Sequence, residues 1–125
     1  MEANELMIGD WVIGSSGEPF KIGIIDPDFL YWNEVQPIPI TSEIFEKNGF
    51  IKQGLDGWEY IHPDDSTFSY IGYRILWRTD YDNHLFIKKY KGSGTSATLQ
   101  ISGINYVHQL QHALRLCGIE KEIIL

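Results

Sequence analysis

The clearest pattern of apolar and polar positions in this chain lies near its end, in residues 103–118. At 100° per residue, one arc of about 120° collects side chains that are mostly apolar, namely Tyr106, Val107, Leu110, Ala113, Leu114 and Cys117. The opposite side carries polar side chains, namely His108, Gln111, His112 and Arg115. A one-sided apolar stripe is typical of a surface helix whose inner face is covered by another layer. The pattern therefore predicts an amphipathic C-terminal helix over residues 103–118 that packs on a sheet.

Short apolar runs separated by turn formers predict strands in the first third of the chain. A turn into a first strand is indicated over residues 6–14, a second strand over residues 20–25 and a third over residues 29–35. Three short strands in succession resemble a small SH3-like meander, which we expect over residues 1–36. The likeness is one of fold and implies no function by itself.

A proline-rich connector and a short helix are expected over residues 37–50. The two prolines of this segment lack an amide hydrogen and favour an extended backbone before them, which excludes a helix and central pairing in a sheet. Thr41 or Ser42 can then cap a short helix over residues 43–48.

Glycine is expected to end both helices. Gly49 and Gly118 each follow a predicted helix, where a left-handed glycine closes the last turn. In the first helix, the residue after the glycine is Phe50, and the accompanying apolar contact would be with Phe45.

Between the helices, alternating apolar and polar positions predict four strands, at residues 58–62, 67–79, 84–90 and 95–101. In the second of these, apolar side chains at odd positions from Ile71 to Trp77 alternate with Arg74 and Arg78, as in an antiparallel sheet with one covered face. We expect this sheet within residues 57–102. Together these elements predict a single α+β domain over residues 1–125.

The formal net charge of −7 is unevenly distributed. Residues 1–62 carry eleven acidic and three basic side chains, whereas residues 63–125 carry six acidic and seven basic ones. Because binding of a phosphate backbone draws on many Lys and Arg contacts, the acidic half is a poor candidate for it. The densest basic cluster, Lys88, Lys89 and Lys91, is expected at a strand edge that runs into a Gly/Ser loop.

The composition is that of a globular chain with one core, since 43% of the residues are hydrophobic and there are four Trp, seven Tyr and six Phe. No window approaches the roughly 18 apolar residues of a membrane span, and residues 1–6 lack the features of a signal peptide. We therefore expect a cytoplasmic location and no membrane partner. The single cysteine, Cys117, is expected as a small buried hydrophobe of the helical stripe.

Two histidines, His108 and His112, stand four residues apart on one face of the predicted C-terminal helix, a spacing that lets two imidazoles reach one metal ion. Gln109 occupies the position at which a zinc protease has its glutamate, and Cys117 projects to the opposite side, so no third ligand is evident. We expect a solvated polar face, with no metal and no cofactor. No catalytic set is recognised, and we expect the protein not to be an enzyme.

Three blocks of sequence carry a family resemblance: residues 6–12, residues 35–50 and residues 106–111. They resemble a family of small, uncharacterised proteins of Bacteroidetes-type bacteria and their phages or mobile elements. The resemblance implies a phage or mobile-element origin, but no activity and no catalytic residues. The chain departs from the family pattern directly after the third block, at residues 112–116.

We therefore expect a non-catalytic interaction or accessory protein of phage or mobile-element origin. Its partner would be a host or phage protein, or a second copy of the chain. The candidate contact residues are polar or aromatic side chains that burial does not require, namely His108, Gln109, Gln111, His112, Trp32, Lys88, Lys89 and Lys91.

Two other function classes are kept as alternatives. One is a nucleic-acid-associated protein, which would bind through the lysine cluster with Arg74 and Arg78, or would use its acidic first half as a mimic of DNA. The other, weaker alternative is a small hydrolase that uses His108 or His112 with a carboxylate.

Overall fold

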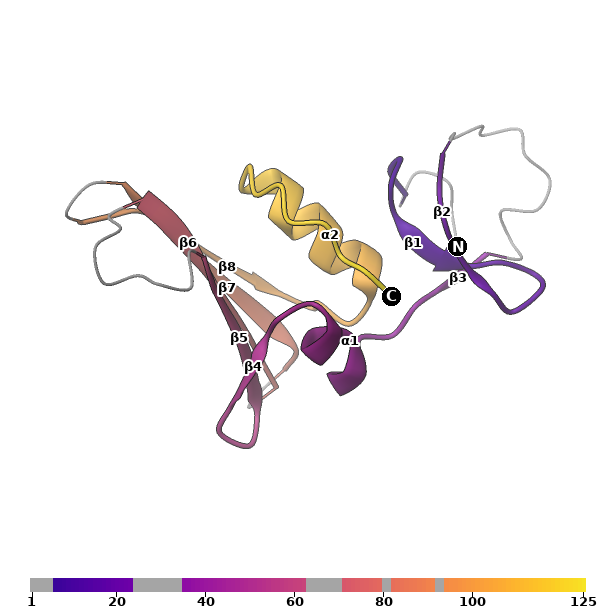
Figure 1. Cartoon of the computed structure of the whole chain (residues 1–125), viewed down its shortest axis with the longest axis horizontal. Coiled ribbons are helices and arrows are strands. Elements are labelled where there is room, and N and C mark those ends of the chain that lie inside the picture. The colour runs from indigo at the N-terminus through magenta and orange to yellow at the C-terminus, as the bar shows by residue number, and fades with distance from the viewer. Residues whose placement is uncertain (1–5, 24–34, 63–70, 80–81, 92–93) are drawn as a thin grey trace. The chain divides into compact units, whose positions relative to one another are not determined.

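The computed structural model describes residues 6–23, 35–62, 71–79, 82–91 and 94–125. It is an α+β fold, mostly β, with antiparallel sheets and two helices (Figure 1). Contacts between residues divide the chain into two compact units, residues 1–40 with 105–122 and residues 41–104 with 123–125. The expectation of one domain stays a prediction.

The first unit contains a three-stranded antiparallel sheet in the order β2-β1-β3. The hairpin of β1 (Trp11–Ile13) and β2 (Pro19–Lys21) confirms the first two predicted strands in part, since β2 ends at Lys21 and residues 24–25 lie outside the described part. The third strand, β3 (Gln36–Pro37), begins after the expected segment, of which residues 29–34 lie outside the described part. A segment expected only as a connector therefore pairs with β1, and it does so at the edge of the sheet, where a strand tolerates proline.

Helix α2 (Val107–Leu116) begins four residues later than predicted, after the extended Tyr106. Its end confirms the predicted glycine stop: Gly118 has a φ of +71°, and the amide of Ile119 donates to the carbonyl of Leu114 at 2.9 Å. The apolar stripe is buried as expected at positions Val107, Leu110, Ala113 and Leu114. Cys117 is half-buried at the C-cap rather than fully buried, because the helix ends there.

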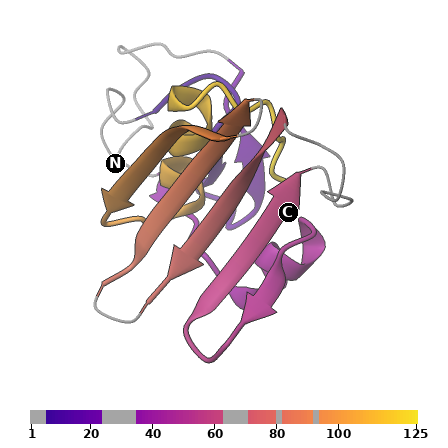
Figure 2. The ribbon, with the colours of Figure 1, turned by 90° about the vertical axis from the view of Figure 1, so that its left-hand side faces the viewer.

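The second unit contains a five-stranded antiparallel sheet in which sequence neighbours are also spatial neighbours, in the order β4-β5-β6-β7-β8 (Figure 2). The four predicted strands are confirmed where the structure describes them: β5 (Gly57–His62), β6 (Ile71–Arg78), β7 (His84–Lys91) and β8 (Gly94–Ser102). Strand β4 (Ile51–Gln53) was not expected, because its three side chains are exposed and show no alternation.

One face of this sheet carries the core of the second unit, which includes the buried side chains Trp58, Ile75, Leu85 and Ile87. Helix α1 (Ser42–Lys47) lies on that face, since the ring of Phe45 packs against Trp58 at 5.7 Å and Trp77 at 5.0 Å between centroids. Figure 2 shows the other face of the sheet toward the viewer, with α1 behind it. We call that other face the open face.

Sequence signals at both ends of α1 are confirmed. The hydroxyl of Thr41 accepts a hydrogen bond from the amide of Ile44, so Thr41 is the N-cap. Gly49 has a φ of +83°, and the amide of Phe50 donates to the carbonyl of Phe45 at 2.9 Å. The two phenyl rings lie 4.9 Å apart, which is the apolar contact expected of this stop.

Replacing Gly49 with alanine should lower the free energy of unfolding by about 1–2 kcal/mol, because a left-handed backbone costs that much once a Cβ is present. Gly23→Ala is the matched control, since a Cβ there meets no atom within 4 Å and no positive φ is required. Urea unfolding followed by tryptophan fluorescence measures both variants. Equal stabilities would contradict the assigned role of Gly49.

Candidate functional site

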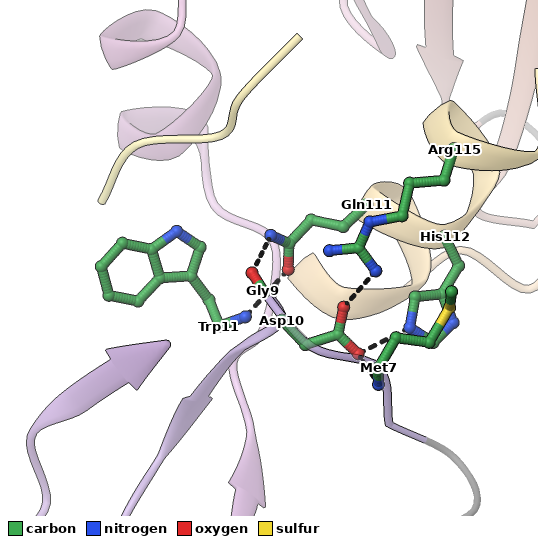
Figure 3. Close-up of polar contacts among 7 residues, drawn as sticks. All are labelled: Met7, Gly9, Asp10, Trp11, Gln111, His112 and Arg115. Carbon is green, nitrogen blue, oxygen red and sulfur yellow. Dashed lines mark hydrogen bonds and ion pairs between the residues drawn. The ribbon is translucent and has the colours of Figure 1, made fainter. Parts of the chain in front are cut away.

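The predicted interaction surface on α2 turns out to hold an internal polar cluster of the first unit (Figure 3). Asp10 is completely buried, and its carboxylate accepts a hydrogen bond from the amide of Met7 at 2.7 Å. Arg115 donates to the same carboxylate at 2.8 Å, and Nε2 of His112 lies 2.6 Å from it. A buried carboxylate is tolerated when charged and polar donors surround it, so this cluster ties α2 to residues 7–10.

Gln111 extends the same tie to β1. Its side-chain oxygen accepts a hydrogen bond from the amide of Trp11 at 2.9 Å, and its side-chain nitrogen donates to the carbonyl of Gly9 at 2.9 Å (Figure 3). Both partners are backbone groups, so the side-chain amide of Gln111 makes the hydrogen bonds that a neighbouring strand would otherwise make.

The expectation that this helix face is solvated is therefore wrong. His108 and Gln111 are buried, and His112 and Arg115 lie against Asp10. Gln109 accepts hydrogen bonds from the backbone amides of residues 105 and 106, at 2.8 and 3.1 Å, and so serves the start of the helix. These polar side chains are needed inside the unit because they face the carboxylate of Asp10 and the backbone groups of Gly9 and Trp11.

Other candidate residues from the sequence are distributed differently from expectation. Trp32 and the side chain of Lys91 lie outside the described part of the chain. The rings of His108 and His112 are in edge contact, 5.6 Å apart, but among the described residues no three His, Cys, Asp or Glu side chains are placed to hold one metal ion.

The lysine cluster is split by the sheet. β7 lies between β6 and β8, so the expected position at a strand edge is wrong. Successive side chains of a strand point to opposite faces, and in the register Lys88 lies opposite Arg74 whereas Lys89 lies opposite Tyr73. Tyr73 and Lys89 lie on the core face. There, burial and then the neighbouring Tyr60 raise the pKa of the Tyr73 hydroxyl, so this hydroxyl stays protonated and neutral.

The open face instead combines cations from two strands around a cavity of about 270 Å³. We call it the cationic cavity, and its lining residues are Arg74, Leu76, Arg78, Phe86 and Lys88. The strand register places Leu76 opposite Phe86 in the middle, with Arg74 and Lys88 at one end and Arg78 at the other. The cavity therefore has an apolar floor between two positively charged ends.

Glu59 positions one of these cations. Its carboxylate is buried and accepts a hydrogen bond from Nε of Arg74 at 2.6 Å, while Gln53 donates to its other oxygen at 3.4 Å. The carboxylate of Glu59 thus holds the guanidinium of Arg74 in place and partly balances its charge, while 43% of the arginine side chain stays exposed.

His84 positions the aromatic ring in the same way. The imidazole is buried and meets the ring of Phe86 edge-on, with the centroids 5.2 Å apart. Its Nδ1 lies 3.0 Å from the carbonyl oxygen of Asp82 and 3.1 Å from the carboxylate of the same residue. Phe86 is half-buried, and its contact with His84 restricts the orientations of its ring.

Lys88 is the third cation of the cationic cavity. It is exposed, it has no acidic partner in the part of the chain that the structure describes, and it lies directly opposite Arg74. Like charges directly opposite each other destabilise a sheet. Glu59 partly balances Arg74, so Lys88 adds positive charge to this end of the cavity.

Comparisons with known proteins give no match. No protein-family model matches the chain, and neither a curated protein nor a solved structure matches it significantly. None of the described helices has the length and apolar character needed to cross a membrane.

Asp10→Ala should lower the free energy of unfolding by about 3 kcal/mol, near the lower end for breaking a buried ion pair because His112 and Arg115 keep some access to water. Asp56→Ala is the control, since that residue is exposed and its backbone carbonyl, which the substitution keeps, accepts the hydrogen bond from the amide of Thr79. Urea unfolding measures both. If the two variants unfold at the same urea concentration, the buried carboxylate is not a structural tie.

Lys88→Glu should stabilise the protein by about 0.2–1 kcal/mol, because the new carboxylate would face Arg74 across the strand pair. Lys52→Glu is matched in charge change, but Lys52 lies opposite Trp58 and should gain nothing comparable. Midpoints of thermal or urea unfolding compare the two. A destabilised Lys88→Glu variant with an unchanged Lys52→Glu variant would show that Lys88 is held by contacts of its own.

Proposed function

We propose that this protein is a non-catalytic binding protein that holds an anionic partner on the open face of its five-stranded sheet. The observation that carries this proposal is the cationic cavity, in which Arg74, Arg78 and Lys88 surround Leu76 and Phe86. Convergent cations around an apolar floor are typical of sites that bind a charged ligand with an apolar part.

The distribution of charge supports a local site. Most of the net charge of −7 belongs to the sequence of the first unit, whereas the sequence of the second unit has eight acidic and seven basic side chains. A nearly neutral unit with three cations around one cavity has a short-ranged positive field, because salt screens exposed charges beyond about 8–10 Å. The partner is therefore bound by close contacts rather than attracted from a distance.

Internal pairing of acid–base groups supports binding over catalysis. His112 lies against Asp10, His84 against Asp82, and Glu59 holds Arg74. These groups hold the framework together and orient the cavity wall. We keep a phage or mobile-element origin, an SH3-like first unit and the packing of α2 on a sheet as parts of the same proposal.

Fluorescence anisotropy with two labelled polyanions tests the proposal: an oligothymidylate of about 12 nucleotides, a length within single-strand site sizes, and a poly-glutamate peptide of the same length. We expect at least one probe to bind, and Lys88→Glu to weaken that binding about tenfold, because a contact cation becomes an anion. Lys52→Glu changes the net charge equally and should stay within about twofold, since it lies outside the cavity.

Binding of neither probe, or equal losses in the two lysine variants, would refute the proposed function. In the second case the effect would come from net charge and not from the cavity.

A further inference from the structure

We infer that the cationic cavity binds a short stretch of single-stranded nucleic acid, with a base stacked on Phe86 and phosphates on the cations at both ends. The inference rests on the proposed function and names the class of its anionic partner. The stacking position and the two charged ends come from the register of β6 and β7.

The size and lining of the cavity favour a flat ring over a protein surface. Specific protein interfaces bury more than about 1,000 Å² and have cores depleted in charge, whereas the apolar floor here consists of Leu76 and Phe86 with cations directly beside them. The volume of about 270 Å³ suits one planar group of the size of a nucleobase.

The aromatic platform favours a base in particular. The rings of His84 and Phe86 are nearly perpendicular, with an interplanar angle of 80° and centroids 5.2 Å apart, and His84 is buried with its Nδ1 3.0 Å from the carbonyl oxygen of Asp82. Every nucleobase has a flat π-face, and stacking on an aromatic side chain is the usual anchor for unpaired bases. An acidic peptide would supply the charges but no ring for this position.

The spacing of the cations favours a backbone that crosses the face. Arg74 and Arg78 are four residues apart on β6, so their Cα atoms are about 13 Å apart at the rise of a strand. Lys88 lies beside Arg74, so the positive charge is concentrated at the two ends and absent from the middle. A nucleotide strand has this order of groups, phosphate, base and phosphate, and in a duplex the base would be unavailable for stacking.

The number of cations sets the expected dependence on salt. Each phosphate neutralised in a single strand contributes about 0.7 to the slope of log affinity against log salt concentration. With Arg74, Arg78 and Lys88 in the cavity, the slope should be about −2, far shallower than for a protein with an extended basic surface.

The experiment uses the full chain and four probes in anisotropy or competition: the single-stranded oligothymidylate, a hairpin duplex of equal length, the poly-glutamate peptide and free thymidine monophosphate. We expect the single strand to bind best, with a salt slope of about −2. Phe86→Leu keeps an apolar side chain and removes the ring, so it should weaken the single strand about tenfold and leave the slope unchanged. Lys88→Glu should reduce both the affinity and the slope.

Circular dichroism and unfolding curves accompany each variant. Phe86 is half-buried, so Phe86→Leu is expected to change the free energy of unfolding, and this change is measured separately from binding. Lys88→Glu is expected to be at least as stable as the parent, so its loss of binding cannot come from unfolding. If Phe86→Leu does not fold, Lys88→Glu tests the inference: it should make the salt slope shallower, and an unchanged slope would overturn the inference.

The outcomes separate the two proposals. Preference for the poly-glutamate peptide would overturn the nucleic-acid inference and leave the proposed function standing. Equal binding of duplex and single strand, equal affinity for the free nucleotide, or an unchanged affinity of a folded Phe86→Leu variant would overturn the stacked single strand. Binding of none of the four probes would overturn both.

Discussion

The register between β6 and β7 decides which side chains share a face, and the architecture of the second unit depends on it. Side chains alternate along a strand, so a shift by one residue would exchange buried and exposed positions. In the observed register, Ile75 lies opposite Ile87 in the core, and one position earlier on β6, Arg74 lies opposite Lys88 on the open face. The apolar pair therefore brings the two cations together, because one pairing cannot form without the other.

The two faces of this sheet differ in how they are packed. On the core face, Phe45 of α1 packs on Trp58 and Trp77, so large aromatic surfaces are removed from water, and Nε1 of Trp77 donates to the carbonyl of Ile104. On the open face, buried polar residues such as Glu59 and His84 do not cover the cavity but hold its wall. The core can therefore be packed tightly while the cavity keeps exposed charge.

Those parts of the fold that depend on neighbours in sequence could be predicted. The strands from β5 to β8 follow from alternation, and the ends of both helices follow from glycine, since these signals act within a few residues. The partners of Asp10 could not be predicted, because His112 and Arg115 lie about a hundred residues away and a polar helix face usually points to water. A carboxylate between apolar residues at the start of a strand was the available signal, since it must find donors.

The candidate site could be predicted only in part from the sequence, for a related reason. Arg74, Arg78 and Lys88 were grouped in the nucleic-acid alternative, but together with Lys89 and Lys91. Separating Lys89, which lies on the other face, required the register between the strands, which no local pattern specifies. An acidic side chain in place of Lys88 would give Arg74 a second carboxylate beside that of Glu59, and opposite charges across a strand pair stabilise a sheet whereas like charges do not. A folded protein tolerates such a cost as long as the core keeps it above the threshold of stability. Glu59 partly balances Arg74, so Lys88 adds positive charge to this end of the cavity, and the proposed anionic partner would balance that charge.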